Sequence, residues 1–261
     1  MPPAGPTSSQ TTGRKSEILS KNRKRKKTTR RTLKTRANCT NYFTVVGTNA
    51  NGILSKLDSL ENLVDHFKCA VLFLQETKVS RKGQVKIPGY DIFEVVRSNA
   101  KGGSILTALH SNLQPVYISG GEDDMEILVI QAKIGNSNCR FINAYGPQEY
   151  ATLEDKIAFY ARLDQEVKNA KLFNCLVCLE MDANAKVGYN VIKNDPNAMS
   201  DNGEYLMELM ERNNLIICNA TDKCEGTITR ERVTVNGTEQ CFRLFNSLPG
   251  VVYPPDHLEN R

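Results

Sequence analysis

The sequence has few of the residues that build a zinc or disulfide site. It contains only three histidines, His66, His110 and His257, which lie far apart in the chain. Eight cysteines are present, but the closely spaced pair Cys175 and Cys178 has neither a second pair nor spaced histidines to complete a zinc set. Five cysteines lie in or beside apolar runs, where reduced thiols pack as small hydrophobic groups. We therefore expect a reducing compartment and no disulfides.

The sequence also lacks long apolar runs. The longest has about eight residues, which is too short to cross a bilayer. Residues 1–16 contain no apolar stretch of the kind found in secretory signals. With 261 residues, 40% of them apolar, the chain suits one large α/β domain or two small ones. We expect no membrane association and infer no obligate protein partner.

Acidic residues are nearly absent from the first forty positions. Residues 1–40 carry 12 lysines and arginines and one acid, Glu17, whereas residues 41–261 carry 22 basic and 28 acidic residues. A block of like charge repels itself and stays disordered, and lysine and arginine suit phosphate contacts or nuclear import. We predict that residues 1–40 form a disordered basic tail that binds nucleic acid and directs the chain to the nucleus; a solvated tail without function is the alternative. The residues expected to contact nucleic acid are Lys21, Arg23, Lys24, Arg25, Lys26, Lys27, Arg30 and Arg31.

Residues 41–240 alternate between strand-like runs and amphipathic helices. Apolar spacing predicts helices over residues 53–67, 153–170 and 202–214, and strands over 41–49, 69–76, 174–184 and 215–221. Five further strand-like runs lie between residues 89 and 147 without an intervening helix, which favours antiparallel pairing. A helix between two strands instead implies parallel neighbours. The order predicts two packed mixed sheets with helices outside them.

Polar side chains follow four of the predicted strands, in the order Asn49 and Asn51, Glu76, Asn143 and Tyr145, Asp182 and Asn184. Each signal alone is weak, since a charge such as Glu76 often only marks the exit of a strand into solvent. In open α/β sheets, however, ligands bind at the carboxyl ends of strands. Two carboxylates, several amides and a phenol at one edge would supply hard oxygen ligands, which suit Mg²⁺ or Mn²⁺ rather than zinc.

Four motifs carry a resemblance to a known family. "TNANGI", "LFLQETK", "INAYGP" and "DANAKVG", in this order and spacing, resemble the endonuclease/exonuclease/phosphatase family, whose fold is a four-layered α/β sandwich. The similarity covers about residues 44–240. The downstream stretches "DNGEYLMELMERNNLIICNAT" and "GTITRERVTVNGTE" are similar to the endonuclease domain of LINE-type (non-LTR) retrotransposons. The resemblance therefore implies a metal-dependent DNA endonuclease domain.

The resemblance also implies a role for five residues. Glu76 matches the family's metal-binding glutamate and Asn49 the asparagine that supports the metal site. Tyr145 matches the tyrosine that contacts the scissile phosphate, Asp182 the aspartate that positions or deprotonates the attacking water, and Asn184 the asparagine that stabilises the transition state. Two alternatives stay open: a phosphatase of the same family acting on a small phosphorylated molecule or lipid, and a catalytically inactive remnant that binds nucleic acid.

The sequence departs from the family pattern in two places. Met181 stands where the family has a glycine, so we expect a disturbed strand end there. The family continues with an aspartate-bearing strand and a Ser-Asp-His motif, whereas residues 241–261 read as an atypical tail interrupted by prolines. The resemblance thus predicts a sandwich that is incomplete at the C-terminus, and the missing aspartate and histidine motifs are the ground for the inactive alternative. Asp256 and His257 repeat the last two letters of the missing motif and are a weak catalytic candidate.

Overall fold

The computed structural model describes residues 44–97, 103–188, 191 and 198–218, and the backbone of three short strands further on: β9 (Arg230–Thr234), β10 (Gly237–Cys241) and β11 (Gly250–Val251). The basic stretch Lys21–Arg36 and the pair Asp256–His257 lie outside the described residues, and the expectations for them stay predictions. The same holds for the boundary expected at residue 40. No helix of the described part is long and apolar enough to cross a bilayer.

The first sheet has the strand order β11-β1-β2-β4-β3. Strands β1 and β2 are parallel, as the helix between them predicts, and the other pairs of this sheet are antiparallel. The connection from β1 to β2 contains a 3₁₀ turn, η1, and then helix α1. The bounds are β1 Thr44–Asn49, η1 Leu54–Lys56, α1 Leu57–Phe67, β2 Val71–Gln75, β3 Tyr90–Val95 and β4 Ile105–His110.

The second sheet has the order β5-β6-β7-β8. Its first three strands pair antiparallel, while β7 and β8 are parallel and joined by α2. Thr152 caps α2 by accepting a hydrogen bond from the Asp155 amide, and Ser200 caps α3 in the same way from the Gly203 amide. The bounds are β5 Val116–Gly120, β6 Ile127–Ile134, β7 Ser137–Tyr145, α2 Leu153–Leu172, β8 Leu176–Asp182 and α3 Asp201–Arg212; short 3₁₀ turns lie at Ser111–Leu113 and Glu122–Asp124.

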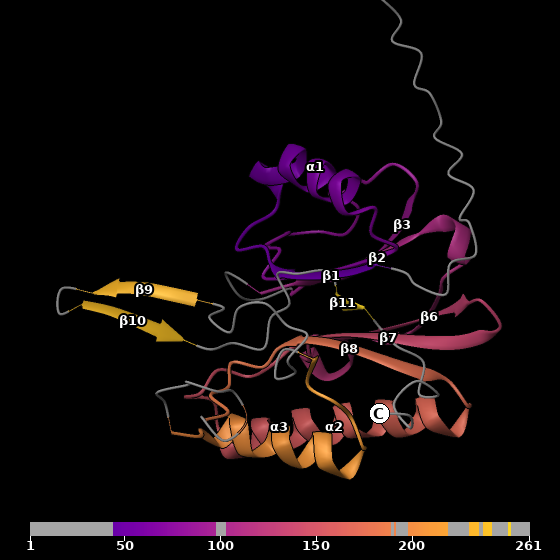
Figure 1. Ribbon diagram of the computed structural model, residues 1–261. Helices are drawn as coiled ribbons and strands as arrows, with labels where there is room; N and C mark the ends of the chain where they lie inside the picture. Colours follow the sequence, from indigo (N-terminus) through magenta and orange to yellow (C-terminus); the bar gives the residue numbers. More distant parts are fainter. Residues whose placement is uncertain are drawn as a thin grey trace, which may run out of the picture. The chain divides into compact units, whose positions relative to one another are not determined.

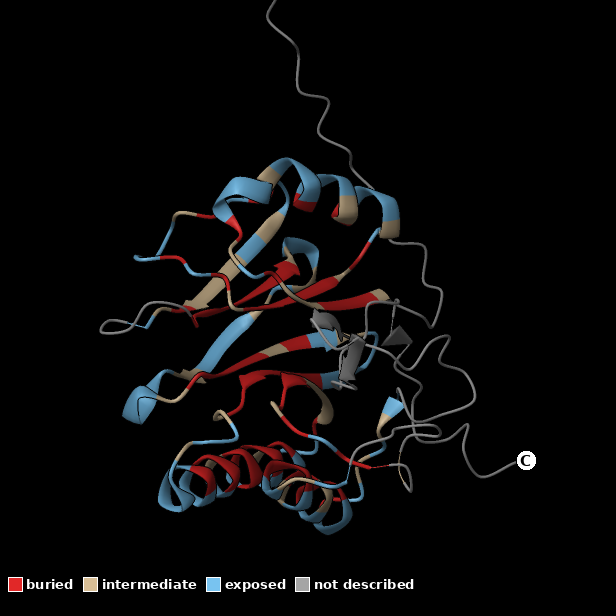
Figure 2. Cartoon of the chain, turned by 90° about the vertical axis from the view of Figure 1, so that its left-hand side faces the viewer, coloured by how far each residue is buried: buried red, intermediate tan, exposed pale blue. Residues whose placement is uncertain are grey.

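Three apolar cores hold these elements in four layers (Figure 1). The two sheets pack face to face, with the rings of Phe73 and Phe141 6.3 Å apart between them. Helix α1 covers the outer face of the first sheet through residues such as Leu60, and α2 and α3 cover the outer face of the second. Figure 2 shows the buried residues on the strands and on the helix sides turned toward them. The predicted four-layered α/β sandwich is confirmed.

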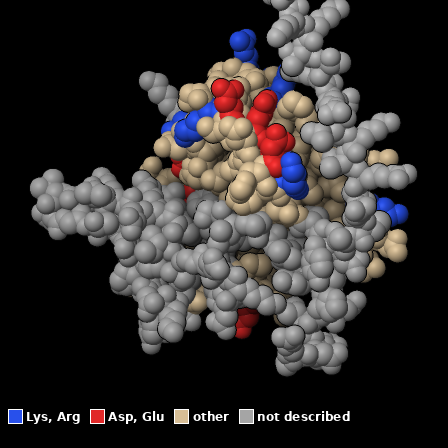
Figure 3. Space-filling view, turned by 45° about the horizontal axis from the view of Figure 1, so that its top comes forward, with Lys and Arg blue, Asp and Glu red and all other residues tan. Residues whose placement is uncertain are grey.

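The surface over α1 carries charges of both signs. Figure 3 shows acidic and basic side chains close together on this face. Helix α1 contributes exposed acids such as Asp58, Glu61 and Asp65, and Lys56 and Lys68 lie at its two ends. This face therefore does not repeat the one-signed charge of residues 1–40.

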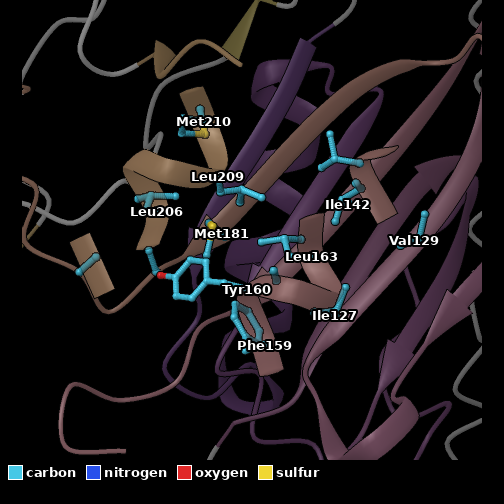
Figure 4. Close-up of a cluster of buried hydrophobic side chains, with 14 of the residues drawn as sticks. Ile127, Val129, Ile142, Phe159, Tyr160, Leu163, Met181, Leu206, Leu209 and Met210 are labelled. Carbon is cyan, nitrogen blue, oxygen red and sulfur yellow. The ribbon is translucent and has the colours of Figure 1, made fainter. Parts of the chain in front are cut away.

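Two expectations about local structure need correction. Residues 215–218 form no strand; Leu215 donates its amide to the Met210 carbonyl at 2.9 Å, which folds the segment back beside α3. Met181 does not disturb the end of β8, because its side chain turns into the core under α2 and α3 (Figure 4) and β8 stays paired as far as Asp182. In the tail, the two residues of β11 pair with Thr44 and Val45 of β1, and the expectation of an atypical tail stays a prediction.

Candidate active site

The carboxyl ends of two parallel strand pairs meet at one edge of the sandwich. Asn49 ends β1, and Glu76 directly follows the neighbouring strand β2. In the other sheet Tyr145 and Asp182 end β7 and β8 and are partners in the register. The Asn49 Nδ2 atom joins the two sheets, since it donates to Glu76 Oε1 at 2.8 Å and to Asp182 Oδ2 at 3.0 Å. The predicted convergence of these strand ends is therefore present.

Tyr145 makes a second link between the sheets. Its hydroxyl donates to Glu76 Oε1 at 3.0 Å. Burial raises the pKa of the Tyr145 phenol, and the nearby charges of Glu76 and Asp182 raise it further. The phenol therefore keeps its proton at neutral pH and acts as a hydrogen-bond donor.

Asn184 is tied to Asp182 and to the turn after β7. Its backbone amide donates to Asp182 Oδ1 at 3.2 Å, and its side-chain Nδ2 donates to the Gly146 carbonyl at 2.9 Å. Gly146 in turn donates its amide to the Asp182 carbonyl at 2.7 Å. A Cβ at Gly146 would lie 2.8 Å from the Ala183 carbonyl oxygen, so only glycine fits this close approach of two backbones.

Glu76 and Asn184 have unusual backbone conformations. Their φ angles are 49° and 46°, in the left-handed region that L-residues other than glycine visit rarely. Asparagine tolerates this region, whereas for glutamate it costs about 1 kcal/mol or more. The conformation at Glu76 is held from outside, because its carbonyl accepts from the Gly52 amide at 2.8 Å. The turn directs the Glu76 carboxylate toward Asn49 and Tyr145.

The structure brings two further amides to the cluster that the sequence analysis missed. Gln148 Nε2 donates to the Tyr145 hydroxyl at 2.8 Å. Asn202, in the first turn of α3, donates to the carbonyls of Pro147 and Asn184 at 2.8 and 3.1 Å. No pattern in the sequence shows that Asn202 lies close to the strand ends. Gln148 could have been predicted as a member of the cluster, because it follows Tyr145 by only three residues.

Two residues expected at this edge do not join the cluster. Asn143 is fully buried between the sheets, where it accepts from Gln75 Nε2 at 2.7 Å and donates to the Leu106 carbonyl at 2.9 Å. The expectation for Asn143 was wrong, because alternate residues of a strand share a face but only the last one lies at the edge. Asn51 is exposed, and its Oδ1 accepts from Lys78 Nζ.

The oxygen-rich edge fits a hard divalent cation by its chemistry. Oxygens of Glu76 and Asp182 both accept from one Asn49 nitrogen, so two carboxylates lie within reach of a single ion. No group of three or more histidine, cysteine, aspartate or glutamate side chains able to hold a metal occurs among the described residues. Asn49 turns its nitrogen toward the carboxylates while its Oδ1 accepts from the Asn51 amide at 3.0 Å. The metal role of Asn49 stays a prediction.

The fold is shared with structurally characterised nucleases. The endonuclease domain of TRAS1, a telomere-specific non-LTR retrotransposon, has a TM-score of 0.54 and 16% identity, over 77% of this chain and 83% of that one. The AP endonuclease LMAP from Leishmania major has a TM-score of 0.58 and 16% identity, over 75% of this chain and 74% of that one. An AP endonuclease from Archaeoglobus fulgidus has a TM-score of 0.54 and 18% identity, over 74% of this chain and 80% of that one. No protein-family model and no curated protein matches the sequence.

These similarities identify the class of fold. The two mixed sheets with outer helices have the architecture of these endonuclease structures. At 16–18% identity the likeness establishes the fold and no more. What the chain does must be argued from its own cluster of side chains.

Proposed function

We propose that the chain is a divalent-metal-dependent phosphodiesterase that acts on DNA, of the retrotransposon endonuclease type. The observation that carries this proposal is the single network joining Asn49, Glu76, Tyr145 and Asp182 across the two sheets. Structures named as endonucleases share the fold, which supports the choice of a nucleic acid as substrate.

Each side chain of the network suits one task in phosphodiester hydrolysis. A Mg²⁺ or Mn²⁺ ion held by Glu76 would offset charge on the phosphoryl oxygens. Asp182, which is fully buried and held by Asn49 and the Asn184 amide, would orient the attacking water and accept its proton. Tyr145 and Asn184 are neutral donors, so they would stabilise developing negative charge without competing for that proton.

Nicking of supercoiled plasmid by the purified chain, with Mg²⁺ and with EDTA, tests the proposal. We expect nicking only with the metal, and we expect Glu76→Gln to reduce the rate by about 100-fold or more. Glu61→Gln is the matched control, because it removes an exposed carboxylate from α1, away from the strand ends. It should leave the rate unchanged.

The remaining outcomes separate the alternatives. Release of phosphate from a small monoester or phospholipid headgroup without plasmid nicking would favour the phosphatase. Neither activity, together with DNA binding that depends on residues 1–40, would favour the inactive nucleic-acid-binding protein. Loss of nicking in both glutamine variants would point to unfolding, which circular dichroism would detect.

A further inference from the structure

Glu126 is a buried acid that the reaction outlined above does not use. It lies just before β6 and is 3% exposed. One carboxylate oxygen, Oε2, pairs with Arg97 at 2.7 Å, and the other, Oε1, accepts from the Ser104 amide. A buried carboxylate needs such partners to offset its desolvation. Burial raises the pKa of Glu126, while Arg97 and the Ser104 amide act in the opposite direction.

The segment held by Glu126 pairs with the residues that follow Glu76. The Ser104 carbonyl accepts from the Thr77 amide at 2.9 Å and from the Thr77 hydroxyl at 3.2 Å. The Gly103 carbonyl accepts from the Lys78 amide at 3.0 Å. These bonds fix the chain directly after Glu76, whose own φ of 49° requires support from its surroundings.

Glu126 also binds the main chain of Tyr145 through its own backbone carbonyl. The Glu126 carbonyl accepts from the Tyr145 amide at 2.9 Å. The side chain of Glu126 therefore contacts the segment that holds the turn after Glu76. Its main chain contacts the strand end that carries Tyr145. Glu76 and Tyr145 are the partners in the hydrogen bond between the sheets.

The close fit of Gly103 shows that the contact is built tightly. A Cβ at Gly103 would lie 2.8 Å from Glu126 Oε1 and 3.2 Å from the Arg97 guanidinium carbon. Its φ of +73° also favours glycine. The turn at Gly103 thus closes directly on the pair that the buried Glu126 carboxylate forms with Arg97.

We propose that Glu126, paired with Arg97, is a positioning residue that sets the placement of Glu76 relative to Tyr145. The inference rests on the function proposed above. Its consequence is kinetic, because a displacement of about 1 Å at a reacting group can cost on the order of 100-fold in rate while substrate binding is retained.

Glu126→Gln tests this, with Glu166→Gln as a closely matched control. Glu166 in α2 is 4% exposed and pairs with Arg162 at 2.7 Å, and it accepts from the Ser119 hydroxyl at 2.9 Å. Each variant therefore removes the charge of a buried glutamate that pairs with an arginine and accepts a further hydrogen bond. We expect Glu126→Gln to lower kcat for plasmid nicking about 10- to 100-fold with KM changed less than about twofold, and Glu166→Gln to leave kcat unchanged.

Amide hydrogen exchange provides a readout that does not depend on activity. We expect the Thr77 and Lys78 amides to exchange about tenfold faster or more in Glu126→Gln, and at the wild-type rate in Glu166→Gln. Unchanged exchange at these amides, or equal losses of kcat in the two variants, would overturn the proposal. If the wild-type chain does not nick DNA, the proposed function fails, while the exchange rates still decide whether Glu126 holds this turn.

Discussion

Asn49 holds two carboxylates with one amide nitrogen, and replacing it by aspartate tests whether those carboxylates form a single site. Asn49→Asp keeps the shape of the side chain but exchanges the donor Nδ2 for a charged oxygen. That oxygen would stand where Nδ2 now lies, 2.8 Å from Glu76 Oε1 and 3.0 Å from Asp182 Oδ2. Two attractive contacts would become two repulsive ones.

The size of the effect follows from the distances and the exposure. Two charges about 3 Å apart repel by about 1.4 kcal/mol in water and about 5.5 kcal/mol at an effective dielectric constant of about 20. Asn49 and Glu76 are half-buried, so solvent screening and side-chain movement reduce the larger figure. We expect Asn49→Asp to lower the free energy of unfolding by about 2–4 kcal/mol near pH 8. Asn49→Ala loses the same hydrogen bonds without added charge and should cost about 1–2 kcal/mol.

Urea unfolding of both variants at several pH values measures the difference between them. Repulsion raises the folded-state pKa of the introduced carboxyl above its unfolded value, which is about 3.9 for an aspartate. The extra loss in Asn49→Asp should therefore be complete above the raised pKa and disappear as the pH falls toward about 4. Mg²⁺ should restore more stability to Asn49→Asp than to Asn49→Ala. Equal stability of the two variants near pH 8 would refute a shared site.

Three other predictions concern separate parts of the chain. Tyr145→Phe removes a hydrogen-bond donor to Glu76 and should slow nicking about 10- to 100-fold at nearly unchanged stability. Because burial raises the pKa of Tyr145, the wild type and the variant should show the same tyrosinate absorbance below about pH 10. Met181→Ala should cost about 2–4 kcal/mol in urea unfolding, and a loss under about 1 kcal/mol would contradict its core position. Deleting residues 1–40 should weaken DNA binding and reduce the slope of log K against log salt concentration by several units, and an unchanged slope would exclude the tail as the anchor on DNA. A reporter protein fused to residues 14–36 should enter the nucleus.

The secondary structure could largely be predicted because its signals are local. The three- and four-residue spacing around Leu57, Leu60 and Val64 predicted a helix that the structure has as Leu57–Phe67. The apolar run before Glu76 is the fully buried strand β2. The prediction of a strand at residues 215–221 was wrong for its described part, since an apolar run alone does not tell a strand from a segment that packs beside a helix.

The orientation of buried polar groups could not be predicted. Asn143 and Tyr145 lie two residues apart in β7, yet Asn143 is sealed between the sheets while Tyr145 reaches Glu76. Which of the two reaches the edge depends on where the strand ends relative to its partners, and this is a property of the assembled sheets. Glu126 gave no signal for the same reason, because its partners Arg97 and Ser104 come from the connection between β3 and β4 of the other sheet.

The sequence by itself determined that Asn49, Glu76, Tyr145 and Asp182 stand at or directly after the ends of strands, since the apolar runs before them specify those strands. Only the tertiary structure decided that they touch. The bond from Asn49 to Asp182 spans 133 positions in the chain, and the bond from Tyr145 to Glu76 spans 69. Contacts over such separations depend on the packing of one sheet against the other, which brings together strand ends that no local pattern relates.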